Sequence, residues 1–264
     1  MKIVVLTRSW RISPGMVVSY LLKNGYEIEG VIVEERSKMI FGDEGMNFKK
    51  IWKLYRKYGF DYIFEKLKEL VLIKLHYLRR KFFPSWENDE FYSIEEVSLV
   101  YPLRIFKVES HNSSQTINLL REIKPEVILT LNARILRREI LKLGRWVINL
   151  HLSLLPKYGG MDSIFWALYH REREIGVTIH KVEEKLDAGE IIAQEKIPVD
   201  ERDNEQTLYF KALRKGRELI LEVLKKLEKG EITLRRMEGE VEYFGIPTRK
   251  DRKKFKRVLK KRND

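Results

Sequence analysis

The chain of 264 residues contains no cysteine, which excludes disulfide bonds, thiolate metal sites and a cysteine nucleophile. It also lacks an apolar run near the ~18 residues of a membrane helix, and its amino terminus lacks the pattern of a secretory signal. We therefore expect a cytoplasmic protein without a membrane partner. Hydrophobic residues still make up 44% of the chain, which is enough for a substantial core.

Acidic residues are the scarcer charged kind, and the formal net charge is +13. Residues 36–84 contain 13 Lys or Arg and 5 Asp or Glu, and residues 249–264 contain 10 Lys or Arg and 2 Asp. Each segment carries +8, so the remainder of the chain carries −3. Because the distribution of charge says more about partners than its total, the main body of the chain is not typical of a nucleic-acid-binding protein.

Short apolar runs alternate with segments of helical periodicity along the first 150 residues. The runs are apolar throughout, which is typical of a parallel sheet that is covered on both faces. We therefore predict an α/β fold with a Rossmann-like, doubly wound and mostly parallel sheet. The predicted strands are residues 2–7, 28–34, 103–108, 126–131 and 146–149, and the predicted helices are residues 14–23, 114–123 and 136–143.

Residues 36–102 interrupt this alternation and form a predicted helical insertion. Apolar residues recur at close to helical spacing between Phe48 and Leu78, and Gly59 is expected to divide the segment into two helices. Three interpretations of the insertion stay open: a solvated basic face of packed helices, a lid that faces phosphate groups, and a contact in a homo-oligomer. The basic residues on the face opposite the apolar one are Lys49, Lys50, Lys53, Arg56 and Lys57.

The last third of the chain predicts two more strands, a long helix and a short appendage. Residues 175–182 and 191–199 have the composition of strands, and residues 204–229 form an amphipathic pattern that ends at Gly230, the expected C-cap. A hairpin is expected at residues 232–244. We expect the basic tail that follows to be solvated or frayed, with a contact to phosphates as the alternative.

The segment from Asn149 to Asp187 sets an amide, an imidazole and a carboxylate around a turn. Asn149 and His151 are two positions apart at the end of a predicted strand, so both side chains point to the same face. A loop with Pro156 can fold back over them, and Asp187 lies in a turn between two strands. Each residue alone is compatible with a structural role. Together they can stabilise an oxyanion and move a proton, so we predict Asn149, His151 and Asp187 as catalytic residues.

This segment resembles the formyltransferases that use 10-formyltetrahydrofolate, a family that contains glycinamide ribonucleotide transformylase, methionyl-tRNA formyltransferase and the sugar N-formyltransferases. The family pattern Asn-x-His-x-Ser-Leu-Leu-Pro is present at residues 149–156, Gly-x-Thr-x-His at residues 176–180, and Asp-x-Gly at residues 187–189. A match in several parts is far more specific than one short motif. Leu152 stands where many members have proline, which leaves the three polar residues intact.

The resemblance implies an enzyme of the formyltransferase fold with 10-formyltetrahydrofolate as co-substrate and no metal. Residues 1–230 would form its catalytic domain, and residues 231–264 a carboxyl-terminal hairpin and basic tail. The folate pterin would lie between a segment that begins at Arg134 and the loop that ends at Asp187. Arg134 could instead be a surface residue or pair with the glutamate tail of the folate. The residues expected to bind the folate are Arg134, Ile135, Leu136, Glu183, Glu184 and Leu186.

The acceptor is expected to be a small amine that carries a phosphate or is linked to a nucleotide, with an amino-sugar nucleotide favoured. The main body of the chain is not basic, and the 34 residues after Gly230 are too few for the additional barrel domain of methionyl-tRNA formyltransferase. Glycinamide ribonucleotide is disfavoured because the turn after the first strand offers only Gly15 for close approach to a phosphate. A tRNA acceptor and an RNA-binding protein on the same scaffold are the alternatives. For His180 two roles stay open, lining the site or holding a loop.

Overall fold

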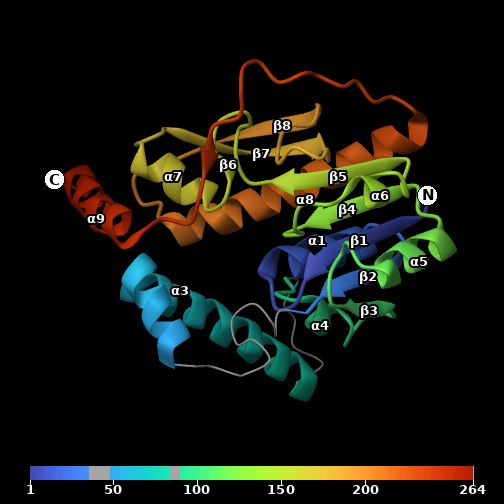
Figure 1. The fold of residues 1–264 in the computed structure, drawn as a ribbon, viewed down its shortest axis with the longest axis horizontal. Helices are drawn as coiled ribbons and strands as arrows, with labels where there is room; N and C mark the ends of the chain where they lie inside the picture. Colours follow the sequence, from blue (N-terminus) through green and yellow to red (C-terminus); the bar gives the residue numbers. More distant parts are fainter. Residues whose placement is uncertain (36–47, 84–89, 264) are drawn as a thin grey trace.

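A seven-stranded sheet forms the centre of the protein in the computed structural model, which describes residues 1–35, 48–83 and 90–263 (Figure 1). The strand order is β3-β2-β1-β4-β5-β7-β8, with parallel pairing from β3 to β5 and antiparallel pairing of β7 and β8. The predicted α/β class with a doubly wound, mostly parallel sheet is therefore confirmed. The strands are β1 (Ile3–Arg8), β2 (Ile28–Glu34), β3 (Ile105–Val108), β4 (Val127–Leu131), β5 (Trp146–His151), β7 (Glu174–Lys181) and β8 (Ile191–Pro198).

Helices cover both faces of this sheet and bury it in two apolar clusters (Figure 1). All of β4 and all of β1 except Arg8 are buried, which explains why these strands are apolar without alternation. One face is covered by α1 (Ile12–Lys23), α4 (Ile94–Val97), α7 (Ser163–Tyr169) and α8 (Glu205–Lys229), and the other by α5 (Ser114–Ile123) and α6 (Arg138–Leu141).

Helix α6 is shorter than the predicted helix over residues 136–143. The side chain of Asn112 holds the preceding backbone in a non-helical path: its Nδ2 donates to Ile135 O at 3.0 Å and its Oδ1 accepts from Arg137 N at 2.8 Å. Arg137 is correspondingly extended, with φ −78° and ψ 158°. The helical periodicity of the sequence is overridden here by contacts from a distant loop.

Helix α8 begins and ends where the sequence predicts. The side-chain oxygen of Asn204 accepts from the backbone N–H groups of Gln206 and Thr207, at 2.9 and 3.0 Å, and so caps the first turn. Gly230 ends the helix in the left-handed conformation, with φ 71°. Within the described ranges, no helix is long and apolar enough to cross a membrane.

Helix α3 (Phe48–Phe82) lies in the predicted insertion, outside the sheet (Figure 1). Gly59, with φ 84° and ψ 171°, divides it into two parts as predicted. Residues 36–47 and 84–89 of the predicted insertion lie outside the described residues. A third apolar cluster holds the second part of α3 against α1 and α8, and its buried members are Ile12, Met16, Ile73 and Leu213.

The hairpin predicted at residues 232–244 is wrong. Arg235 instead bridges to Ile191 of β8, and the short strand β9 (Tyr243–Phe244) pairs in parallel with β6 (Gly159–Gly160). The physical reason is the close approach that glycine allows, because a Cβ on Gly160 would lie 2.4 Å from Phe244 O. Residues 232–244 therefore pair with backbone groups of β8 and β6 and not with one another.

The basic tail, expected to be solvated or frayed, is not frayed, although most of its described side chains are exposed. Residues after Thr248 form α9 (Arg249–Asn263), and the side chain of Thr248 caps it by accepting from Asp251 N at 3.3 Å. Phe255 is buried on this helix and contacts the ring of Phe165 on α7, with 4.8 Å between centroids. Ion pairs of Arg252 with Glu205 and of Lys256 with Asp61 also hold this helix.

Candidate active site

Three neighbouring strands place Thr130, Asn149 and His180 side by side in one row of the sheet. Asn149 is the register partner of Thr130 in β4 and of His180 in β7. The hydroxyl of Thr130 donates to Asn149 Oδ1 at 2.8 Å, and Asn149 Nδ2 lies 3.1 Å from His180 Nε2. These contacts fix the amide so that its NH2 group points toward the histidine.

His180 lines the site, and its contacts determine where its proton sits. Its Nδ1 lies 2.7 Å from Lys181 O, a group that only accepts, so Nδ1 carries the hydrogen and Nε2 accepts from Asn149. Burial, together with the nearby charge of His151, lowers the pKa of His180 to about 4. The ring is therefore neutral at pH 7.

We expect acid to destabilise the protein through His180. The unfolded chain binds this proton with a pKa near 6.5 and the folded protein only near 4, so the stability that the neutral ring contributes is complete above pH 6.5 and is lost as the pH falls toward 4. The loss is on the order of 1–3 kcal/mol. Urea unfolding at pH 7 and pH 5 measures it for wild type, His180→Gln and the exposed control His170→Gln. If His180→Gln lost as much stability at pH 5 as wild type, this assignment would be wrong.

His151, at the end of β5, is buried between the backbone and a carboxylate. Its Nε2 lies 3.0 Å from Tyr158 O, so Nε2 carries a hydrogen, and its Nδ1 lies 3.7 Å from Asp187 Oδ1. A second proton on this ring must therefore bind at Nδ1, beside the carboxylate. A distance of 3.7 Å is longer than a hydrogen bond and leaves Nδ1 accessible to an incoming oxygen.

The carboxylate of Asp187 lies near both histidines. Its Oδ1 lies 3.7 Å from His151 Nδ1 and 3.7 Å from His180 Nε2, and its Oδ2 accepts from Gly160 N at 2.8 Å. The residue is 8% exposed and has φ 49°, a conformation that is uncommon outside glycine and that is often found at functional sites. The three residues predicted from the sequence as a catalytic group thus lie together.

The hydroxyl of Thr178 holds the loop that covers the site. It donates to Ser153 O at 2.6 Å and accepts from Leu155 N at 3.2 Å and from Gln194 Nε2 at 2.8 Å. Sequence reasoning gave this residue no role, although its place two positions before His180 on the same strand face was a usable signal.

Gly160, Tyr243 and Thr130 were also not identified from the sequence. Tyr243 donates to Leu186 O, and Gly160 supplies the N–H that holds Asp187. Thr130 carried a signal, because it is a lone polar residue in an apolar run. No local signal marks Tyr243, since its partner is distant in the chain.

The residues expected to bind folate lie on two segments that border one apolar cluster, which contains Leu136 and packs against Val182. Ile135 is 56% exposed, whereas Leu136 is buried, so only its backbone can reach a ligand. Arg134 Nε pairs with Glu34 Oε1 at 2.5 Å, a partner that the sequence did not indicate. Glu183, Glu184 and Leu186 are exposed on the opposite segment.

Residues 87–224 match the sequence model of the family described as Formyl transferase. The methionyl-tRNA formyltransferase of Kosmotoga olearia is 37% identical over 143 residues, which are 53% of this chain and 46% of that protein. The methionyl-tRNA formyltransferase of Thermodesulfovibrio yellowstonii is 39% identical over 152 residues, which are 57% of this chain and 49% of that protein. The matches thus span about half the length of these relatives.

Solved structures of similar fold include an N-formyltransferase from Helicobacter canadensis in complex with folinic acid and dTDP-3-aminofucose. It aligns with a TM-score of 0.60 and 18% identity over 95% of this chain and 72% of that chain. Glycinamide ribonucleotide transformylase 1 from Symbiobacterium toebii aligns with a TM-score of 0.60 and 16% identity over 90% of this chain and 94% of that chain. At this identity the likeness is one of fold.

Proposed function

The family model covers more than half of the chain, so the protein belongs to the formyl transferase family, and we propose that it moves a formyl group from 10-formyltetrahydrofolate to the amine of a small phosphorylated or nucleotide-linked acceptor. An amino-sugar nucleotide is the favoured acceptor. The observation that carries this proposal is the Asp187 carboxylate, which lies 3.7 Å from both His151 and His180 and is fixed by Gly160 N.

In the proposed reaction a neutral amine attacks the formyl carbon. The new C–N bond forms as negative charge develops on the formyl oxygen, and the bond from the formyl carbon to N10 of the folate then breaks. Asn149 donates its second amide hydrogen to the oxygen, because the first is used by His180. Protonated His151, with Nδ1–H beside Asp187, stabilises the same charge.

Proton transfer completes the reaction. The attacking amine loses a proton and the leaving N10 gains one. Asp187, whose charge holds the His151 imidazolium before the transfer, is placed to take the proton of the amine, directly or through water, and to pass it on to N10. Neutral His180 accepts from Asn149 and so keeps the amide oriented without competing for the proton.

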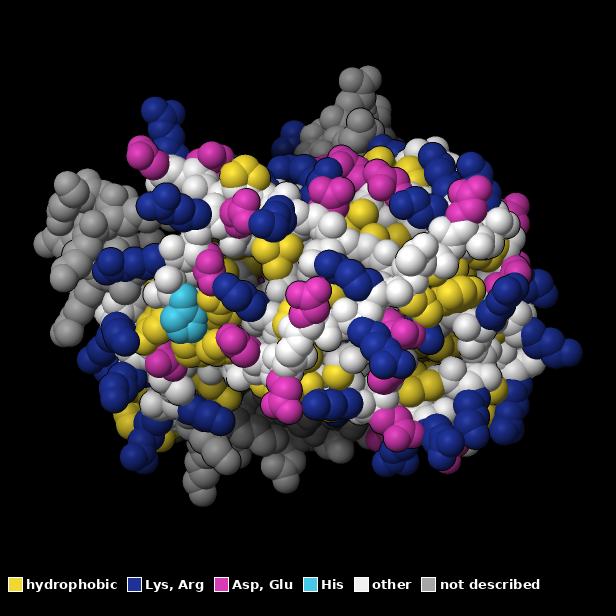
Figure 2. Space-filling model, turned by 90° about the horizontal axis from the view of Figure 1, so that it is seen from above, with side chains coloured by type: hydrophobic (Ala, Val, Ile, Leu, Met, Phe, Trp, Pro, Cys, Tyr) yellow, Lys and Arg dark blue, Asp and Glu magenta, His cyan; other side chains and the backbone are white. Residues whose placement is uncertain are grey.

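The described residues bear on two of the acceptors. Gly15 lies inside α1, where a Cβ would come within 2.4 Å of Ser93 N, so helix packing explains this glycine and it gives no support to a glycinamide ribonucleotide acceptor. Figure 2 shows Lys and Arg side chains interspersed with Asp and Glu on the face seen from above. Such a surface is not typical of a binding site for a long polyanion.

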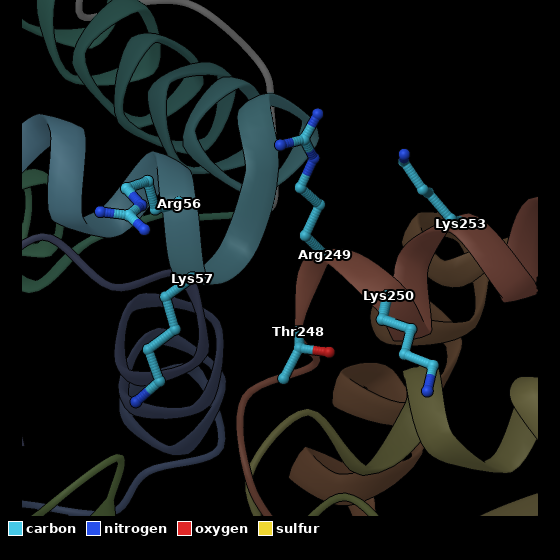
Figure 3. Close-up of a pocket in the computed structure, with 6 residues that line it drawn as sticks. All are labelled: Arg56, Lys57, Thr248, Arg249, Lys250 and Lys253. Atoms are coloured by element: carbon cyan, nitrogen blue, oxygen red, sulfur yellow. The ribbon is translucent and has the colours of Figure 1, made fainter.

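A tRNA acceptor is the second candidate, and a basic cleft of about 540 Å³ between α3 and α9 favours it. The cleft walls carry their cations on diverging side chains, with Lys250 and Lys253 pointing in opposite directions (Figure 3). This arrangement fits an extended phosphate backbone better than one compact phosphate. The residues that line the cleft are Arg56, Lys57, Thr248, Arg249, Lys250 and Lys253.

We expect formyl transfer to amino-sugar nucleotides in a panel of amines, with rates that change less than about threefold between 50 and 200 mM KCl, because one or two phosphate contacts release few counterions. The double variant Arg56→Gln/Arg249→Gln should leave this activity unchanged. Transfer confined to aminoacylated tRNA, with a loss of at least tenfold over the same salt range and in the double variant, would replace the small acceptor by tRNA. No transfer to any amine would contradict the proposed function.

A further inference from the structure

The outer face of the second part of α3 carries a continuous apolar stripe. Its members are separated by 4, 3, 4, 4, 3 and 4 residues, which is an 11-residue repeat and keeps them on one side of a nearly straight helix. At 1.5 Å per residue the stripe is about 33 Å long. Its seven side chains are between 44% and 67% exposed, and they are Phe60, Phe64, Leu67, Val71, Leu75, Leu78 and Phe82.

The opposite face of this helix packs against the rest of the protein. Ile73 is fully buried against α1 and α8, and Arg80 Nε forms a buried ion pair with Glu96 Oε1 at 2.8 Å. The guanidinium of Arg80 also lies over the ring of Phe91, 4.0 Å from its centroid. The stripe is therefore a second apolar face on a helix that is already docked.

The area of the stripe is that of an interface. Seven side chains with these exposed fractions present on the order of 700 Å² of apolar surface, more than the largest patch of a typical monomer. One partner in a specific protein interface contributes about 800 Å². Contact along this stripe alone supplies most of that area.

The order of residues in the stripe fits a second copy of the chain as the partner. Val71 is its midpoint, and the other members form pairs at equal distances on either side: Leu67 with Leu75, Phe64 with Leu78, and Phe60 with Phe82. A two-fold axis at Val71 with antiparallel helices therefore brings every member against its counterpart, as an isologous contact requires. Val71, the smallest member, lies where the two helices approach most closely.

The charges beside the stripe also favour the antiparallel arrangement. Asp61 and Glu65 lie on one flank near the beginning of the stripe, and Arg79 lies on the same flank near its end. With antiparallel helices, Arg79 lies level with Asp61 and Glu65 of the second copy, although Asp61 also pairs with Lys256 of its own chain at 2.8 Å.

We propose that this chain forms a two-fold symmetric dimer in which the second parts of two α3 helices pack antiparallel along the stripe centred on Val71. The pairing does not depend on which acceptor is formylated. The stripe lies on a helix at the edge of the molecule in Figure 1.

The test uses the full-length chain at about 50 µM in sedimentation or light scattering. We expect twice the mass of the 31.7 kDa chain for wild type and a single chain for Val71→Glu, because two buried carboxylates meet at the axis. Arg79→Glu should weaken the dimer, and adding Glu65→Arg should restore it. Far-ultraviolet circular dichroism confirms that each variant is folded.

Cross-linking tests the antiparallel register, and the absence of cysteine makes it specific. Val71→Cys should form a disulfide-linked dimer on mild oxidation, whereas Phe60→Cys should not, because its two copies lie about 33 Å apart. A monomeric wild type, a dimer that persists in Val71→Glu, or efficient cross-linking of Phe60→Cys would overturn the proposal. Binding of a monomeric wild type to phosphatidylcholine/phosphatidylglycerol vesicles, lost in Val71→Glu, would assign the stripe to a lipid surface instead.

Discussion

Replacement of Asp187 by Asn is expected to lower the kcat of formyl transfer by on the order of 10³-fold, because proton transfer by a positioned group contributes about 10²–10⁴. The amide keeps the hydrogen bond from Gly160 N, so the loop stays in place. It cannot accept a proton from the amine, and it removes the charge beside His151 Nδ1. We expect the affinity for a folate analogue to change by less than about threefold, since binding does not require the charge.

The matched control is Glu190→Gln, which makes the same chemical change in a nearby carboxylate that pairs with Lys181 at 3.4 Å near the surface. This variant should retain wild-type kcat. The comparison requires single-turnover kinetics with saturating 10-formyltetrahydrofolate and the best acceptor. Equal rates for wild type and Asp187→Asn would eliminate the proposed role of Asp187.

Replacement of Thr178 by Val is expected to destabilise the protein by about 3 kcal/mol and to lower formyl transfer at least tenfold. Valine fills the same space but leaves Ser153 O and Leu155 N buried without their partner, at about 1–3 kcal/mol each. The loop would then lose its attachment to β7. Since Tyr158 O in this loop holds His151, the imidazole would lose its fixed orientation.

Urea denaturation and the transfer assay measure the two effects of Thr178→Val. Thr178→Ser keeps the hydroxyl and should recover most of the lost stability and activity. Thr233→Val, at an exposed position, makes the same chemical change and should alter stability by less than about 0.5 kcal/mol. If Thr178→Val matched the Thr233→Val control, the hydroxyl would not be the attachment of the loop.

The central strands could be predicted because strands that are buried on both faces are apolar throughout. β2 begins and ends at the residues predicted, and α8 follows its two caps, Asn204 and Gly230. These features are local: each depends on residues within a few positions. The common face of Asn149 and His151 could also be predicted locally, because residues two positions apart in a strand point to the same side.

Other parts of the structure depend on distant residues and could not be predicted. β9 pairs with Gly159–Gly160, more than 80 residues earlier, and Arg134 pairs with Glu34, 100 residues away. The neutral state of His180 follows from its burial and from the carbonyl of Lys181, neither of which a pattern of residue types reveals. The proposed catalytic group could be identified from its sequence motif. The contacts that hold this group in position come mainly from residues distant in the chain.

The pairing of β6 with β9 fixes the order in which the site is completed during synthesis. Gly160 N holds the Asp187 carboxylate, and the strand that positions Gly160 ends at Phe244. A growing chain therefore contains Asn149, His151 and Asp187 long before it can hold them in register, because domains acquire their final contacts only as the required residues leave the ribosome. The chain is thus expected to become competent for transfer abruptly, when residue 244 emerges, and not gradually with length.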